Sequence, residues 1–146
     1  MEIRNMTEAD LPEVCDIENE SFSDPWSEKS FRDSLLDEKN GYLVAEVDGK
    51  IAGYCGLWGI AGEGDIYNVA VKKEFRRKHI GEALLKTLIQ QSIERGITSF
   101  TLEVRASNEP AIKLYESLGF HGVGIRKDFY TKPKEDAVIM WLDRMQ

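Results

Sequence analysis

Hydrophobic residues recur at helical spacing most clearly over residues 80–95, and they alternate with polar residues most clearly over residues 98–106. The first segment places its apolar residues on one face of a helix that Gly96 ends; they are Ile80, Leu84, Leu85, Leu88 and Ile89. The second is typical of a half-buried strand. One face would carry Phe100, Leu102 and Val104, and the other Thr101, Glu103 and Arg105.

Three further helices are predicted from the side chains that can cap their first turns. The first lies within residues 7–22, with Thr7 or Asp10 as its N-cap. The second lies within residues 24–41, with Ser27 as its N-cap, and the third lies within residues 108–120, with Asn108 as its N-cap. The second is expected to end near Gly41, and the third at Gly119 after a proline in its first turn.

Runs rich in β-branched and aromatic residues predict the strands. Residues 41–60 contain two such runs joined at Asp48-Gly49, a strong hairpin signal. Further strands are expected over residues 64–71, 120–130 and 136–145. Strands at the start, a crossover helix in the middle and a final hairpin together predict a mixed α/β sheet.

Composition and charge narrow the class of protein. With 146 residues, 42% of them hydrophobic and 31% charged, the chain is expected to form one domain over residues 1–146. It has no apolar run of membrane-spanning length and no signal-peptide pattern, which favours a cytoplasmic location and no membrane partner. Cys15 and Cys55 are too few for a disulfide framework or a metal cluster, and buried thiols are expected. The net charge of -7 argues against broad nucleic-acid binding but suits a basic protein substrate.

A basic segment stands out against this acidic background. Residues 72–78 contain five Lys or Arg against one Glu, between the strand at 64–71 and the helix at 80–95. A helix start offers free N–H groups and a positive dipole end, and Gly81 would allow close approach of an anion. Neither the GxxxxGK[ST] nor the GxGxxG phosphate-binding motif is present. A solvated basic loop is the alternative.

A second candidate group of residues follows in "LEVRASNEPAIKLYESLGF". Glu103 lies near the end of its strand, where open α/β folds often place ligands, and Tyr115 lies in the following helix. Judged singly, Glu103 could be a solvent-facing strand residue and Tyr115 a core aromatic.

Together the two segments resemble the GNAT superfamily of N-acetyltransferases. "YNVAVKKEFRRKHIGEALL" is similar to its acetyl-CoA motif and "NEPAIKLYESLGF" to its second cofactor motif. With "DPWSEKSF", "LEVRASN" and "IRKDFY…EDAVIM", the resemblance narrows to the bacterial ribosomal-protein alanine N-acetyltransferases, the RimI type. It implies an α/β (α+β) fold with a mostly antiparallel central sheet of about six to seven strands and about four helices.

The resemblance also implies a role for each matching residue. Glu103 would accept a proton, Tyr115 would donate one, and the backbone N–H of Val71 would face the thioester oxygen. The residues expected to bind acetyl-CoA are Val69, Ala70, Val71, Arg76, Arg77, Lys78, His79, Ile80, Gly81, Glu82, Asn108 and Tyr115. Those expected to flank the peptide groove are Trp26, Tyr130, Glu135 and Asp136. No metal is implied.

His79 departs from the family pattern, which has a glycine at this position. Either the turn needs no positive φ there, or His79 adopts one at modest cost. The imidazole could add a donor or a charge near a pyrophosphate, or the side chain could point into solvent while the backbone N–H binds.

Elementary chemistry favours an N-terminal amine over a lysine as the acceptor. At pH 7 an α-amine with a pKa of about 8 costs about 1–1.5 kcal/mol to deprotonate, whereas a lysine with a pKa of about 10.4 costs about 4.5 kcal/mol. The leading hypothesis, which the resemblance implies and this chemistry suits, is acetyl transfer to the N-terminal alanine of a basic, small-subunit ribosomal protein, by a monomer or weak dimer. The alternatives are a polyamine or aminoglycoside acetyltransferase and a non-catalytic acyl-CoA-binding module.

Overall fold

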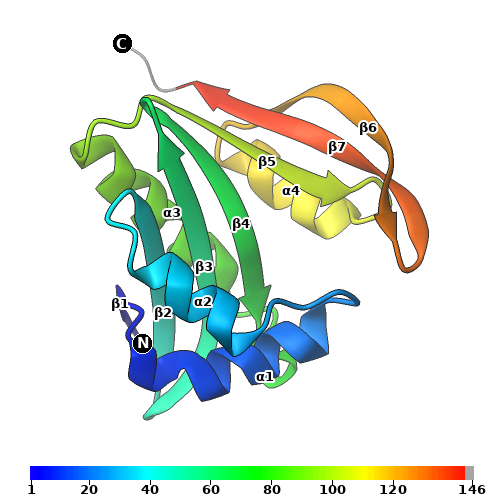
Figure 1. Ribbon diagram of the computed structural model, residues 1–146. Coiled ribbons are helices and arrows are strands. Elements are labelled where there is room, and N and C mark those ends of the chain that lie inside the picture. The colour runs from blue at the N-terminus through cyan, green and yellow to red at the C-terminus, as the bar shows by residue number, and fades with distance from the viewer. Residues whose placement is uncertain (144–146) are drawn as a thin grey trace.

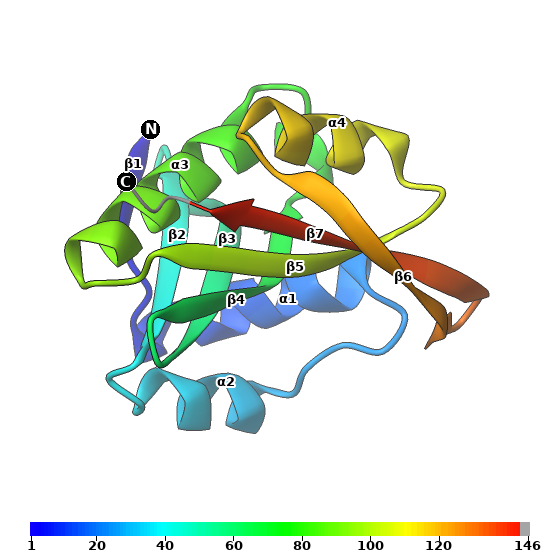
Figure 2. The same cartoon turned by 90° about the horizontal axis from the view of Figure 1, so that it is seen from above.

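The computed structural model describes residues 1–143 and contains one seven-stranded sheet with helices on both faces (Figures 1 and 2). The helices are α1 (Leu11–Ser21), α2 (Glu28–Leu35), α3 (Ile80–Glu94) and α4 (Glu109–Ser117), with short 3-10 turns η1 (Glu8–Asp10) and η2 (Lys73–Phe75). The strands are β1 (Glu2–Asn5), β2 (Asn40–Val47), β3 (Lys50–Ile60), β4 (Glu63–Val71), β5 (Ser99–Arg105), β6 (His121–Thr131) and β7 (Lys134–Asp143). Their spatial order is β1-β2-β3-β4-β5-β7-β6, and within residues 1–143 only the β4–β5 pair is parallel. The predicted fold class is confirmed.

Two hydrophobic cores hold the layers together. The larger lies under α3 and α4, and the smaller lies under α1 and α2 on the opposite face of the sheet (Figure 2). Leu84 and Leu85 of α3 are completely buried in the first, and Phe31 of α2 and Tyr54 of β3 in the second. The apolar stripe predicted for residues 80–95 therefore faces the sheet.

Several local predictions are confirmed by hydrogen bonds and dihedral angles. Asp48 and Gly49 both have positive φ, of 50° and 80°, at the tight turn between β2 and β3. The side-chain oxygen of Ser27 accepts from the N–H of Ser30 at 3.1 Å and caps α2. The side chain of Asn108 caps α4 in the same way.

Other predictions need correction. The helix predicted to end near Gly41 ends at Leu35, because Gly41 pairs with Leu57 inside the sheet. Strand β1 was not predicted; its four residues are too short a run to show a pattern and are ordered by pairing with β2. Cys55 is buried as expected, but Cys15 is only half-buried. The last predicted strand extends to residue 145, and its residues 144–145 lie outside the described part of the chain.

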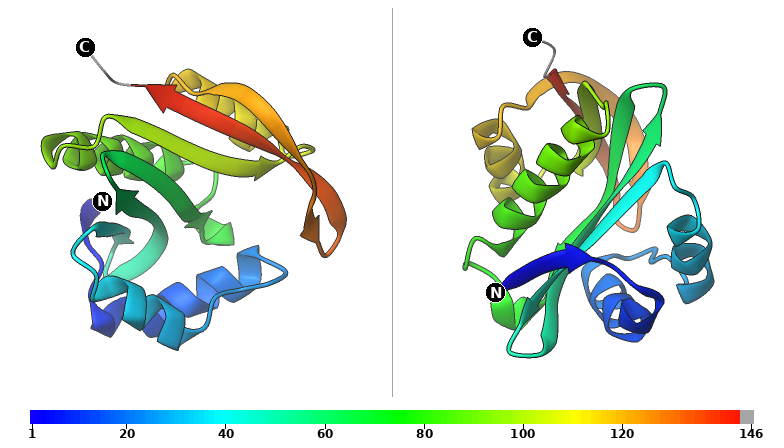
Figure 3. Two further views of the ribbon diagram at one scale, coloured as in Figure 1. Left: turned by 45° about the horizontal axis from the view of Figure 1, so that its top comes forward. Right: turned by 90° about the vertical axis from the view of Figure 1, so that its left-hand side faces the viewer.

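The separation of β4 and β5 is the feature that creates the site. They pair only where Glu63–Asp65 lies beside Ser99–Thr101, and beyond this point the two strands diverge (Figure 1). A bulge in β4, where two residues lie opposite Cys55, bends this strand. The β6–β7 hairpin projects from the same side of the molecule (Figure 3).

Candidate active site

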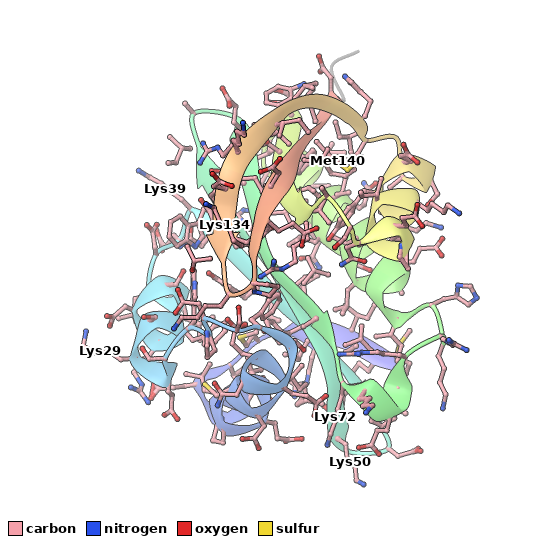
Figure 4. The ribbon with its side chains drawn as sticks, turned by 90° about the vertical axis from the view of Figure 1, so that its right-hand side faces the viewer. Lys29, Lys39, Lys50, Lys72, Lys134 and Met140 are labelled. Carbon is pink, nitrogen blue, oxygen red and sulfur yellow. The ribbon has the colours of Figure 1, made fainter. Side chains whose placement is uncertain are left out.

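A cavity of about 550 Å³ occupies the opening between the diverging strands. Figure 4 views the molecule from this side, with the β6–β7 hairpin near Lys134 above and the end of β4 near Lys72 below. Six predicted site residues line the cavity: Trp26, Val69, Glu103, Asn108, Tyr115 and Tyr130. They come from β4, β5, α4 and β6, from the α1–α2 loop and from the N-cap of α4, so the fold brings together residues that are distant in the sequence.

Glu103 lies in β5 with its side chain on the face opposite the α3–α4 core, as the alternating pattern predicted. Its side chain is 24% exposed. One carboxylate oxygen, Oε2, lies 3.0 Å from Nε of Arg126 in β6. A carboxylate at a cavity wall can accept a proton, and here it already has a cationic partner.

Tyr115 is buried in α4, with 9% of its surface exposed. Its ring packs edge-on against Phe120, with 5.9 Å between ring centroids. Burial raises the pKa of the Tyr115 hydroxyl well above its ordinary value, and the nearby Tyr130 and Cys55 add to this effect. The hydroxyl makes no hydrogen bond to another residue of the described chain, so it is a protonated donor available to the cavity.

The end of β4 directs a backbone donor away from β3. The N–H of Lys72 donates to the carbonyl of Ala52 at 2.7 Å, and because bonding alternates along antiparallel strands, the N–H of Val71 points to the opposite side. Arg76 donates from Nε to the Val71 carbonyl at 3.0 Å and fixes this strand end. Ala70 is buried toward α1.

The basic turn offers both backbone N–H groups and exposed side chains. Arg77 and His79 have positive φ angles of 65° and 61°, so His79 does adopt the left-handed conformation in place of a glycine. No side chain caps α3, and the first helical hydrogen bond runs from the Ala83 N–H to the His79 carbonyl. The N–H groups of residues 80–82 are consequently not used by the helix. The His79 side chain is 88% exposed and approaches Glu82 at 3.5 Å.

Gly81 gives a test of whether an anion fits at this helix start. A Cβ atom there would meet Val71 at 3.7 Å and Leu114 at 3.9 Å, which is ordinary contact, and its φ is not positive. The protein itself therefore has no need of glycine at this position, where alanine would favour the helix by about 1 kcal/mol. A glycine here leaves the backbone open to close approach by a ligand. The turn therefore fits a bound phosphate group.

The four residues predicted to flank a peptide groove fall into two pairs. Trp26 and Tyr130 line the cavity, and the guanidinium of Arg105 lies 4.2 Å from the Tyr130 ring centroid. Glu135 and Asp136 do not line it. Glu135 accepts from the N–H of Ser107 at 2.7 Å and from Arg105 at 3.2 Å.

Asp136 accepts from the N–H of Asp128 at 2.8 Å. Glu135 thus fixes the hairpin against the end of β5, whereas Asp136 fixes the bulge of β6 within the hairpin.

Glu18 and Arg126 are among the residues of the cavity region that were not predicted. Glu18 of α1 is almost completely buried, accepts from the Trp26 N–H at 2.9 Å and is hydrogen-bonded to the Tyr54 hydroxyl. The sequence held a signal for it, because Glu18 follows Leu11 and Val14 at helical spacing and so falls on the apolar face. Arg126 had no such signal, since its pairing with Glu103 depends on how β6 lies across β7.

Comparison with known proteins places this geometry in a family. The sequence model described as the acetyltransferase (GNAT) family matches residues 11–120. The chain belongs to the GNAT acetyltransferase family. This confirms the predicted family, fold and enzyme class, and the members of this family use acetyl-CoA.

The similarity to individual proteins extends over nearly the whole chain. The [ribosomal protein bS18]-alanine N-acetyltransferase of Escherichia coli is 38% identical over 142 residues, or 96% of this chain and 95% of that protein. A Bacillus subtilis protein provisionally given the same name is 43% identical over 141 residues, or 96% of this chain and 93% of that protein. The crystal structure of the E. coli enzyme superimposes with a TM-score of 0.91 at 37% identity and covers 99% of this chain and 94% of that one. Among residues 1–143, no helix has the length and apolar character needed to cross a membrane.

Proposed function

We propose that this acetyltransferase transfers the acetyl group of acetyl-CoA to the α-amine of an N-terminal alanine on a ribosomal protein. The observation that carries the proposal is the cavity between β4 and β5, which is lined by Glu103, Asn108 and Tyr115 together. The names and full-length similarity of the E. coli and B. subtilis proteins support the choice of substrate.

The chain offers a binding surface for acetyl-CoA in two parts. The N–H groups at the start of α3, with the exposed basic side chains of residues 76–78, would hold the pyrophosphate. Val69 and the end of β4 would line the path of the pantetheine arm, and Asn108 would contact it at the cavity wall. When bound, acetyl-CoA supplies an acetyl group activated as a thioester.

The residues of the cavity match the proton transfers that this reaction needs. Glu103 would accept a proton from the α-ammonium group, directly or through a water molecule. The Val71 N–H would stabilise negative charge that develops on the thioester oxygen. Tyr115 would donate a hydrogen bond to the departing sulfur, and its raised pKa favours this role over complete proton transfer.

The cavity also suits a peptide better than a small polyamine. Its outer wall carries Trp26, Phe129 and Tyr130, which are large rings able to cover the side chains of a peptide. The cytoplasmic location and the monomeric or weakly dimeric state remain predictions.

A substrate panel tests the proposal. The protein is incubated with acetyl-CoA and an Ala-initiated peptide, the same peptide with a blocked N-terminus and one internal lysine, or spermidine, and free thiol is measured. We expect kcat/KM to be highest for the free N-terminal alanine, by a factor of about 10² or more, since a lysine costs about 3 kcal/mol more to deprotonate. Thiol release with spermidine alone would show that the substrate is a small amine.

A further inference from the structure

Arg126 approaches the proposed base from a strand that is not adjacent to it. Glu103 in β5 is paired with Ile139 of β7, and Arg126 in β6 is paired with Ala137 of β7. The arginine side chain therefore reaches across β7 to place Nε 3.0 Å from the Glu103 carboxylate. The ion pair lies at the wall of the cavity, because Glu103 lines it.

A bulge in β6 holds this part of the strand in place. Three residues of β6, 127–129, lie opposite the single residue Asp136 of β7. Asp128 has a φ of 55°, and its N–H donates to the Asp136 carboxylate at 2.8 Å. The bulge brings Phe129 to the cavity wall, with its ring centroid 5.5 Å from the Arg126 guanidinium. Arg126 is thus held between an aromatic ring and a carboxylate.

Among the described groups around Glu103, Arg126 is the one that carries a positive charge beside its carboxylate. Glu103 also interacts with Tyr67 of β4 and Tyr130 of β6, and burial raises the pKa values of both hydroxyls, so both are neutral at pH 7. Arg105 of the same strand is instead bonded to Glu135. The permanent cation beside Glu103 in the described chain is therefore Arg126.

A substrate α-amine with a pKa of about 8 arrives mostly as an ammonium ion at pH 7. It needs the same carboxylate, and two cations at one carboxylate repel each other. The Arg126 side chain is 58% exposed, against 24% for Glu103, so the arginine can move into water while the glutamate stays at the cavity wall.

We propose that Arg126 is a resident counter-ion of Glu103 in the free protein and that the α-ammonium group of the substrate displaces it. This rests on the proposed function, because it assigns Glu103 to the amine. The exchange keeps the carboxylate paired with a cation before and after binding. Arg126 would therefore compete with the substrate's charged amine for the Glu103 carboxylate. It would not compete with any other part of the substrate.

The binding of two peptide ligands to the protein tests this exchange. One ligand is a hexapeptide that begins with alanine, and the other is its des-amino analogue, which begins with a propionyl group; both are titrated calorimetrically in the presence of CoA. In Arg126→Gln we expect the amine peptide to bind about two- to fivefold more tightly, the range of an exposed ion pair, and the analogue to bind unchanged. Lys127→Gln is the matched control, because it removes the neighbouring cation, which makes no ion pair within the described chain.

The outcomes separate this inference from the proposed function. In a Glu103→Gln background, Arg126→Gln should no longer alter the preference for the amine peptide. An equal change for both ligands, or weaker binding of the amine peptide alone, would overturn the exchange and leave the substrate assignment standing. If neither peptide binds to any variant, the proposed substrate is wrong and the exchange fails with it.

Discussion

Tyr115 combines two properties that are seldom found together in a structural tyrosine. It is buried at the cavity wall, yet its hydroxyl makes no hydrogen bond to another residue of the described chain. Because the hydroxyl lines the cavity and makes no bond within the described chain, a phenylalanine would serve the core at least as well. Under the proposed function, this hydroxyl would contact the sulfur of acetyl-CoA.

Tyr115→Phe should therefore lower kcat by about 10² while the dissociation constant of acetyl-CoA changes little. The removed atom would contact the sulfur as the thiolate forms, and the ring would still pack against Phe120. Steady-state kinetics with the Ala-initiated peptide and calorimetric binding of acetyl-CoA measure the two quantities. An unchanged kcat would exclude Tyr115 from the chemistry.

The start of α3 contains a residue whose backbone conformation is strained. His79 adopts a left-handed conformation that costs an L-residue about 1–2 kcal/mol, and its exposed imidazole makes only a 3.5 Å contact with Glu82. The structure accordingly favours the backbone of His79 over its side chain as the binding group.

His79→Gly should raise the free energy of unfolding by about 0.5–1 kcal/mol, because glycine adopts this conformation without strain but gains entropy when unfolded. CoA affinity should stay the same from pH 6 to pH 8. The comparison variant is His79→Ala, which also lacks the imidazole but keeps Cβ, and should show no gain in stability. A CoA affinity that falls with rising pH in the natural protein and not in His79→Gly would instead assign a role to the imidazole.

Most elements could be predicted from local sequence, since helical spacing, caps and the Asp48-Gly49 turn each act within a few residues. The exceptions depend on distant partners. β1 is ordered by pairing with β2, and the end of α2 at Leu35 is set by the pairing of Gly41 with β3. The positive φ of Arg77 had no signal either, because arginine has no preference for that conformation.

At the scale of the whole molecule, the site depends on an irregularity of the sheet. The separation of β4 from β5 after three residue pairs makes the cavity, and no local pattern in either strand marks where pairing stops. Resemblance to the family predicted Glu103, Asn108 and Tyr115 as site residues, and all three line the cavity. It did not supply Arg126 or the internal partners of Glu135 and Asp136, which depend on the registers of β5, β6 and β7.

The same burial that shapes the two cores should make the protein sensitive to alkaline pH. Burial raises the pKa values of Tyr54, Tyr115 and Cys55 in the folded state. Above the ordinary pKa values, about 8.5 for a cysteine and about 10 for a tyrosine, the unfolded chain loses these protons while the folded chain keeps them. Stability is therefore fully present below those values and falls as pH rises through them. Each such group lowers the free energy of unfolding by about 1.4 kcal/mol per pH unit in this range.

Tyr115→Phe should reduce this loss by about 1 kcal/mol between pH 10 and pH 11, because one titrating group is removed without breaking a hydrogen bond to a described residue. Urea unfolding in reductant at a series of pH values from 8 to 11 measures the slope. Tyr67→Phe is the control, and its effect should be smaller because Tyr67 is only half-buried. Equal slopes in the natural protein and Tyr115→Phe would mean that the Tyr115 hydroxyl ionises in the folded state as it does in water, which would also weaken its assignment as a protonated donor in the cavity.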